Sequence, residues 1–237
     1  EKSRKSSQNS DSRNSESSDS SGKEADASGS SSNSDTSKGN NASKENDTST
    51  TQKAIALTFD DGPNASSTPI LLDGLKERKV RATFFLIGEN VEKDENEKIV
   101  KRMYEEGHLI GNHTYTHCNL SKLETGEAKK ELEQTDTVIE KITGKQPVFV
   151  RAPYGELPVD SEQDLSRIYI GWTVDPLDWM TEDAGAVVKT VVEEINPGDV
   201  ILLHDCYTSS VQAAIRIVDL LQGKGYEFVT VDHLIMD

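Results

Sequence analysis

The chain has 237 residues, a formal net charge of -16 and only 5% aromatic residues. An acidic chain without a basic stripe argues against nucleic acids and anionic membranes as partners. No apolar run approaches the length of a membrane-spanning helix, so we expect no membrane contact by the folded part.

The first segment of the chain is predicted to be disordered. Residues 1–52 are rich in Ser and Asn and contain no Val, Ile, Leu, Phe, Tyr or Trp. Such a segment buries too little apolar surface to offset the entropy lost on ordering, so we interpret it as a flexible linker. Residues 53–237 suffice for one domain with its own core, which we expect to be a monomer.

The start of the chain gives an expectation about location. The sequence begins at Glu1 rather than Met, so we expect an upstream signal or anchor segment that is missing here. A flexible polar linker suits a domain that is held away from a surface. We therefore expect the protein to be extracellular or attached to the cell surface.

From residue 53 onward, short β-rich runs alternate with longer stretches of helical spacing, and two of these stretches end at Gly107 and Gly144. This alternation predicts an α/β fold with a mostly parallel sheet. About seven strands are too few for a full eightfold barrel, so we favour a distorted, shortened (β/α) barrel, with an open doubly wound sheet as the alternative. In chain order the expected elements are strand 53–59, helix 68–79, strand 81–87, helix 95–107, strand 108–112, helix 125–144, strands 147–150 and 168–174, helix 184–195, strand 199–203, helix 210–225 and strand 227–231.

Polar side chains follow several of the predicted strands directly. In parallel α/β folds the carboxyl ends of the strands meet at one edge, where functional residues gather. The candidates at these ends are Asp60, Asp61, His113, His117, Arg151, Asp175, Asp178, His204 and Asp205. Each one also has a plain structural explanation, such as an Asx turn, an ordinary ion pair or a packed core histidine.

Two histidines suggest a metal site. His113 and His117 are four residues apart, which puts both imidazoles on one face if their segment is helical. Together with a carboxylate they form a His/His/Asp set that suits a catalytic zinc ion with an open coordination position. Taken alone, the pair is better explained as surface polar residues. Three of the five histidines follow predicted strands, however, which favours the functional interpretation.

Five motifs in a fixed order give the sequence a family resemblance. They are "TFDDGP" (58–63), "HTYTH" (113–117), "RAPYG" (151–155), "DPLDW" (175–179) and "LLHD" (202–205). In this order they resemble the motifs of the NodB-type polysaccharide deacetylases, carbohydrate esterase family 4. The resemblance covers essentially the whole predicted domain, and it implies a distorted, shortened (β/α) barrel.

Matched residue by residue, the resemblance implies a metal centre with a base beside it. Asp61, His113 and His117 match the metal ligands of the family. The implied ion is divalent, with Zn²⁺ expected first and Co²⁺ or another divalent ion as alternatives. Asp60 matches the catalytic base, and Arg151 matches the arginine that orients this base.

The same comparison implies an acid and a substrate groove. His204 matches the catalytic acid, and Asp178 matches the carboxylate that pairs with it. Tyr154 matches the residue whose backbone N–H helps to bind the oxyanion. Trp179 and Leu202 match groove residues that hold the sugar and the methyl of its acetyl group.

Some residues near the motifs are given ordinary roles. Ala152 replaces a proline that the family often has in its third motif. Trp172 is expected in the core, and His108 is expected to pack or to form a hydrogen bond before its strand. Asp175 and Asp205 are expected in turns or behind the site. Cys118 and Cys206 follow two motifs closely, and the sequence leaves open whether they form a disulfide.

The resemblance implies metal-dependent hydrolysis of N-acetyl groups on a polysaccharide that contains N-acetylglucosamine. Peptidoglycan is the expected substrate, because the family often acts on it in bacteria. The alternatives are chitin oligomers, a biofilm glucosamine polymer, and acetylxylan, from which O-acetyl groups would be removed. Two further alternatives are a carbohydrate-binding pseudoenzyme and a phosphoesterase, and the second would need more basic residues at the site.

Overall fold

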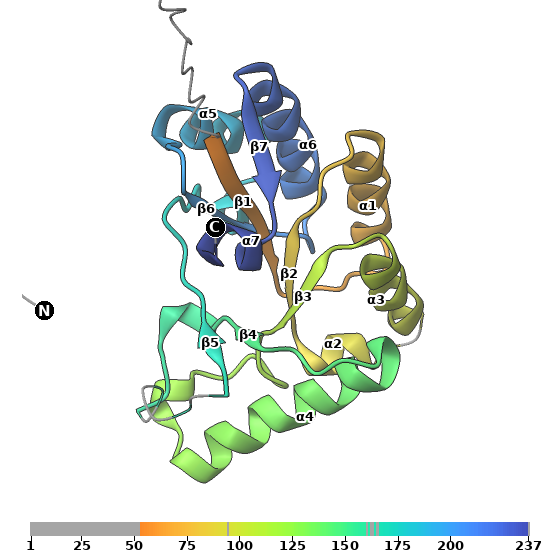
Figure 1. Cartoon of the computed structure of the whole chain (residues 1–237), viewed down its shortest axis with the longest axis vertical. Coiled ribbons are helices and arrows are strands. Elements are labelled where there is room, and N and C mark those ends of the chain that lie inside the picture. Colours follow the sequence, from red (N-terminus) through yellow and green to blue (C-terminus); the bar gives the residue numbers. More distant parts are fainter. Residues whose placement is uncertain (1–52, 94, 160, 162–163, 165, 237) are drawn as a thin grey trace, which may run out of the picture. The chain divides into compact units, whose positions relative to one another are not determined.

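The structure is a computed structural model of the chain (Figure 1). The predicted disorder of residues 1–52 lies outside the residues that it describes. Within the described part, no helix is long and apolar enough to cross a membrane. The residues described are 53–93, 95–159, 161, 164 and 166–236.

Seven parallel strands form one sheet, in which β1 pairs with three strands, β2, β6 and β7 (Figure 1). The order is β5-β4-β3-β2-β1-β6, and β7 also pairs with β1. β1 pairs with β7 along its first half and with β6 along its second half. The strands are β1 (Lys53–Asp60), β2 (Thr83–Leu86), β3 (Leu109–Asn112), β4 (Phe149–Val150), β5 (Ile168–Tyr169), β6 (Val200–His204) and β7 (Tyr226–Val229).

The barrel is distorted where β5 and β6 would close it. The predicted strand 168–174 ends at Tyr169, and closure is left to one bridge between Val174 and Ile201. The strand stops early because Arg151 donates hydrogen bonds to the carbonyl groups of residues 170 and 171. These carbonyls are then not available to pair with a neighbouring strand. The distorted, shortened barrel predicted from the sequence is therefore confirmed, with an incomplete wall at this edge.

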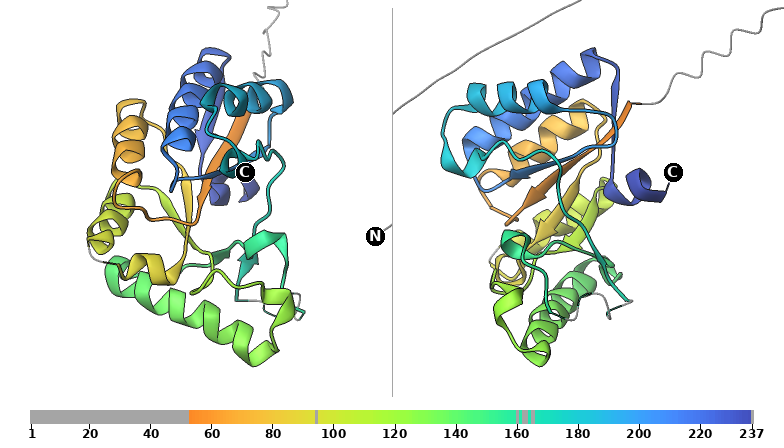
Figure 2. Two further views of the ribbon diagram at one scale, coloured as in Figure 1. Left: turned by 180° about the vertical axis from the view of Figure 1, so that it is seen from behind. Right: turned by 90° about the vertical axis from the view of Figure 1, so that its left-hand side faces the viewer.

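Helices cover the outer side of the sheet, as Figure 2 shows. All five helices expected from sequence spacing are present, and Gly107 and Gly144 follow two of them with the left-handed φ values of 82° and 72° that suit glycine. Two short helices, α2 and α7, were not expected, because segments this short show no periodicity. The helices are α1 (Thr68–Glu77), α2 (Gly88–Val91), α3 (Asn96–Glu105), α4 (Thr125–Thr143), α5 (Ala184–Glu194), α6 (Thr208–Gly223) and α7 (Val231–Met236).

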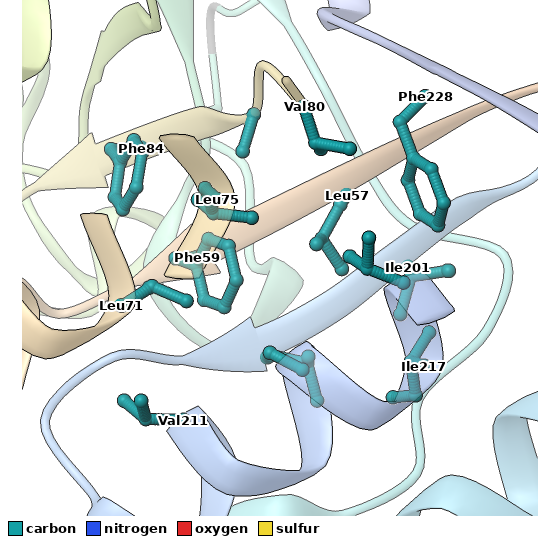
Figure 3. Packing of buried hydrophobic residues seen from close by; sticks show 14 of the residues in the cluster. Leu57, Phe59, Leu71, Leu75, Val80, Phe84, Ile201, Val211, Ile217 and Phe228 are labelled. Atoms are coloured by element: carbon teal, nitrogen blue, oxygen red, sulfur yellow. The ribbon is translucent and has the colours of Figure 1, made fainter. Parts of the chain in front are cut away.

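The main core lies between the sheet and the helices, as Figure 3 shows. Alternate residues of β1, including Leu57 and Phe59, point into this core. Phe59 stacks on Phe84 of β2, with ring centroids 5.2 Å apart. Ile217 of α6 packs into the same cluster. The intervening residues of β1 point to the opposite face of the sheet, where the candidate site lies.

His108 precedes β3 and is buried and neutral. Its ring accepts a hydrogen bond at Nδ1 from the Ala82 N–H, 3.1 Å away, and packs edge-on against Phe84. Burial lowers the pKa of His108 from 6.5 to about 4. The expected packing and hydrogen-bonding role of this residue is therefore confirmed. Protonation at Nδ1 would both break the hydrogen bond and bury a charge.

We predict that His108 makes the fold sensitive to acid. The unfolded chain takes up this proton near pH 6.5, whereas the folded chain takes it up only near pH 4, so stability is lost as the pH falls through this window. Relative to a His108→Gln variant, the wild type should lose up to about 3 kcal/mol of unfolding free energy across the window. Urea denaturation of both proteins near each end of the window measures this difference, and a pH-independent difference would contradict the prediction.

Candidate active site

The carboxyl ends of the strands meet at one edge, where a cavity of about 410 Å³ opens. β1 ends at Asp60, which pairs in register with His204 at the end of β6. β3 ends one residue before His113, and β4 ends one residue before Arg151. The cavity is lined by all but two of the predicted site residues, namely Asp60, Asp61, His113, His117, Tyr154, Trp179, Leu202 and His204.

Arg151 and Asp178 are the two predicted residues that do not line the cavity. Both are only 1% exposed. Arg151 forms an ion pair with Asp60, and Asp178 forms one with His204. Each buried charge is thus compensated by an opposite charge at the cavity surface, without which its burial would be strongly unfavourable.

The alternation of side chains along β1 directs Asp60 toward Arg151. Phe59 points into the helix-covered core, so its neighbours Thr58 and Asp60 point the other way. Arg151 Nη1 lies 2.9 Å from Asp60 Oδ1 and 2.6 Å from Thr58 Oγ1. The second carboxylate oxygen, Oδ2, lies 3.7 Å from Nε2 of His113. Arg151 therefore holds Asp60 by one oxygen while the other remains beside the histidine.

Asp61 leaves the strand direction and points to the histidines. Its backbone is left-handed, with φ 70°, directly after the last residue of β1. Asp61 Oδ1 lies 3.4 Å from His113 Nε2 and 3.2 Å from His117 Nε2. Within the described residues this buried oxygen receives no hydrogen bond. A buried carboxylate oxygen without a donor is well placed to bind a cation.

The spacing of the three groups fits a metal ion. Asp61, His113 and His117 each offer one ligand atom, and these atoms lie within 4.8 Å of one another. Atoms bound to tetrahedral Zn²⁺ at roughly 2.0–2.1 Å lie roughly 3.3–3.4 Å apart, close to the two oxygen–nitrogen distances found here. Burial acts to raise the pKa of Asp61, but the nearby histidines, His113 foremost, lower it below its usual value. The carboxylate is therefore ionised and able to bind a cation.

The segment that carries the two histidines is not helical, so they do not meet on a shared helical face. Their segment is an irregular loop in which Thr114 and His117 have left-handed φ values of 65° and 58°. The loop turns back on itself, which brings the two imidazole centroids to 5.1 Å from each other. The peptide groups of this loop form hydrogen bonds with groups outside it instead of with each other, as a helix would require. One example is the Gly88 N–H, which donates to the Thr114 carbonyl.

Both imidazoles are oriented by a contact at Nδ1. His113 Nδ1 lies 2.7 Å from the carbonyl oxygen of Arg151, so its N–H donates there and its unprotonated Nε2 faces Asp61. His117 Nδ1 lies 3.3 Å from the hydroxyl of Tyr154, whose ring also packs edge-on against the imidazole. Each histidine therefore presents Nε2 to the carboxylate of Asp61.

His204 and Asp178 form a second ion pair at the cavity. Asp178 begins a short 3-10 helix (Asp178–Met180), and its two carboxylate oxygens accept hydrogen bonds from Nδ1 and from the backbone N–H of His204 at 2.8 Å each. Burial acts to lower the pKa of His204, but the hydrogen bond and charge of Asp178 raise it above the usual value. Asp178 therefore favours the charged form of this imidazole, and Nε2 is the ring nitrogen that Asp178 does not bind.

Aromatic side chains form the walls of the cavity mouth. Tyr154 and Trp179 line it and are 66% and 52% exposed. Trp172 also lines it, which corrects the expectation of a core residue, because the chain leaves the sheet after β5. Tyr207, which precedes α6, is a further lining residue, with its ring centroid 6.5 Å from that of His204. No motif in the sequence marked Tyr207.

Two carboxylates near the motifs have the supporting positions that the sequence suggested. Asp175 lines the cavity, and its Oδ1 accepts a hydrogen bond from the Leu177 N–H in a turn. Asp205 is fully buried and accepts a hydrogen bond from the Thr68 hydroxyl at 2.5 Å. Burial raises the pKa of Asp205 to about 7.

Three other residues in or beside the motifs settle two smaller points. Cys118 and Cys206 are both free thiols, so the disulfide alternative is not formed. Burial raises the pKa of Cys206 to about 12, which keeps its thiol protonated at neutral pH. Ala152, at the position where the family often has proline, is buried and contributes to the cavity wall.

Comparison with known proteins agrees with the motifs. A family model described as polysaccharide deacetylase matches residues 47–170. The chain is 40% identical over 191 residues to the peptidoglycan-N-acetylmuramic acid deacetylase PdaC of Bacillus subtilis, which covers 81% of this chain and 40% of that protein. It is 42% identical over 189 residues to a peptidoglycan-N-acetylglucosamine deacetylase of Bacillus cereus, which covers 76% of this chain and 67% of that protein.

Solved structures give the same result. The structure of PdaC matches with a TM-score of 0.74 at 40% identity, covering 77% of this chain and 90% of that one. A family 4 acetyl xylan esterase from Clostridium thermocellum in complex with a cobalt ion matches with a TM-score of 0.72 at 32% identity, covering 76% and 89%. The chain spans 40% of the length of PdaC as a whole protein. From the family model, the relatives and the fold together, we conclude that the chain belongs to the polysaccharide deacetylase family.

Proposed function

We propose that the chain is a metal-dependent deacetylase that removes N-acetyl groups from peptidoglycan. The observation that carries this proposal is the division between the two adjacent aspartates. Asp61 lies against two histidine nitrogens at distances suited to a shared ion, whereas Asp60 is held separately by Arg151. The cavity thus offers a ligand set and, beside it, a carboxylate free to accept a proton.

Asp61, His113 and His117 would hold the ion, which we propose to be Zn²⁺, with Co²⁺ as the alternative. A bound divalent ion lowers the pKa of water and polarises a carbonyl oxygen. The orphaned oxygen of Asp61 and the orientation of both imidazoles support this assignment. The cobalt ion in the structure of the related acetyl xylan esterase also supports it.

Asp60 would act as the general base and His204 as the general acid. Asp60 takes the proton of the attacking water through Oδ2, because Arg151 already occupies its Oδ1. The backbone N–H of Tyr154 donates to the oxygen that becomes negative after attack. His204 then protonates the departing amine, and its pairing with Asp178 keeps it charged until that moment.

The lining of the cavity supports a neutral acetamido sugar as substrate. Its walls combine the aromatic faces of Trp179 and Tyr207 with Leu202, which suit a sugar ring and an acetyl methyl group. Among the described lining residues none is Lys or Arg, which disfavours a phosphate ester. We propose N-acetylglucosamine of peptidoglycan, and the N-acetylmuramic acid named for PdaC is the second candidate. A peptidoglycan substrate implies an extracellular or cell-surface location.

We predict that activity requires both the ion and Asp60. Removing the metal with a chelator should abolish acetate release, and adding Zn²⁺ or Co²⁺ should restore it. Asp60→Asn should lower the turnover number about 100-fold or more while the protein still binds metal, because the base is lost and the three proposed ligands are unchanged. His113→Ala should lose both metal and activity. His233→Ala, which changes an exposed histidine, is the control; activity that survives confirmed metal loss would contradict the proposal.

We predict that the basic limb of the pH–rate profile reports His204. Because this residue must donate a proton, the rate should fall as the pH rises above its raised pKa. Asp178→Asn removes the carboxylate that favours the cation, so the limb should move by about one unit or more to lower pH. The exposed Glu182→Gln should leave the limb in place. An unchanged profile in Asp178→Asn would remove His204 from the role of acid.

The substrate is tested by acetate release from peptidoglycan, chitin oligomers and acetylxylan. We expect acetate release from peptidoglycan. In the masses of the digested fragments, N-acetylglucosamine should be the sugar that lacks its acetyl group. Loss from N-acetylmuramic acid alone would favour the second candidate. If the metal-loaded protein releases no acetate from any of the three, it is better explained as a carbohydrate-binding pseudoenzyme.

A further inference from the structure

The loop that carries His113 and His117 adopts a conformation that its own sequence does not favour. Thr114 is β-branched and has a φ of 65°, and His117 has a φ of 58°. Non-glycine residues rarely take such values, and β-branched ones least of all. The loop therefore depends on groups outside it to keep this shape, and the position of His117 depends on the loop.

A carboxylate from α4 binds the backbone of this loop. Glu131 Oε2 accepts hydrogen bonds from the N–H groups of Tyr115, at 3.0 Å, and of Thr116, at 2.8 Å. The Thr116 hydroxyl lies 3.1 Å from both carboxylate oxygens. Successive N–H groups next to a left-handed residue form an anion-binding nest, and here the chain supplies the anion itself.

The opposite side of the loop is held by α2 and by β3. The N–H groups of Gly88 and Glu89 donate to the carbonyls of Thr114 and Tyr115 at 3.0 Å each. The side chain of Asn112 accepts from the Thr114 N–H at 2.8 Å. The contacts from α2 to the loop backbone are made by backbone N–H groups, which substitution leaves in place, whereas Glu92 at the end of α2 binds the Tyr115 hydroxyl rather than the loop backbone. Glu131 is therefore the side chain through which the middle of the loop can be tested.

Glu131 has no comparable task on its own helix. α4 is packed by its buried residues, among them Leu132 and Ile139. Its neighbour Glu133 pairs with Lys129 along the helix surface, whereas no ion pair among the described residues includes Glu131. The carboxylate of Glu131 is thus committed to the histidine loop rather than to the packing of α4.

We propose that Glu131 is a positioning residue for the metal site, because its carboxylate fixes the loop that brings His117 to Asp61. The inference rests on the metal site of the proposed function. His113 is attached directly to β3 and is held by the Arg151 carbonyl, so it keeps its place without Glu131. Loss of Glu131 therefore removes one ligand of three from reach and weakens the ion's binding.

The test is calorimetric titration of Co²⁺ into the full chain after removal of metal. Glu131→Ala should bind Co²⁺ about 10-fold or more weakly than wild type, the range found when groups that orient metal ligands are removed. Glu131→Gln keeps an acceptor oxygen but loses the charge, so its affinity should lie between those two. Glu133→Ala removes an exposed carboxylate from the same helix and should match wild type.

The outcomes separate this inference from the proposed function. If wild type binds Co²⁺ and folded Glu131→Ala binds it within about twofold, Glu131 does not position the site, and the proposed function is unaffected. An equal loss in Glu131→Ala and Glu133→Ala also overturns the inference. Circular dichroism of the metal-free variants checks folding, and if Glu131→Ala is unfolded, Glu131→Gln with wild-type affinity overturns it. No Co²⁺ binding by wild type would overturn the metal site itself.

Discussion

The buried ion pair between Asp60 and Arg151 is the interaction on which the site and the sheet around it depend. It joins the end of strand β1 to the residue that follows β4, and the same guanidinium binds the carbonyls of Ile170 and Gly171 after β5. Breaking one partner of such a pair leaves an uncompensated buried charge, which typically costs about 3–5 kcal/mol. Arg151 therefore sets the barrel's incomplete edge and the orientation of Asp60 at the same time.

The adjacent aspartates take different positions because only the first belongs to the strand. Asp60 follows the alternation of β1 and points to Arg151, whereas Asp61 lies beyond the strand in a left-handed turn and points to the histidines. Arg151 compensates the charge of Asp60, which reduces the repulsion between the neighbouring carboxylates. Arg151 binds Oδ1 of Asp60, which leaves Oδ2 beside His113.

Backbone strain is concentrated around the cavity. Apart from Lys79, every described non-glycine residue with positive φ lies in one of the five motifs: Asp61, Thr114, His117, Tyr154 and Leu177. Such conformations cost of order 1–3 kcal/mol each, and they persist only where the surroundings impose them. The carboxylate of Glu131 and the side chain of Asp175 are two such surroundings, because each accepts hydrogen bonds from the backbone of a strained segment.

The sequence by itself determined the parallel strand–helix order and the residues at strand ends, because hydrophobic periodicity and chain position are local properties. For the same reason it identified Asp60, Asp61 and His204 as candidates. Only the tertiary structure decided that the histidine segment is a loop rather than a helical turn, since its peptide groups bind partners from α2 and α4. The tertiary structure also decided the positions of Glu131 and Tyr207. A glutamate on the polar side of a helix and a tyrosine outside the motifs give no local signal of a role, and the loop that Glu131 binds lies in another part of the sequence.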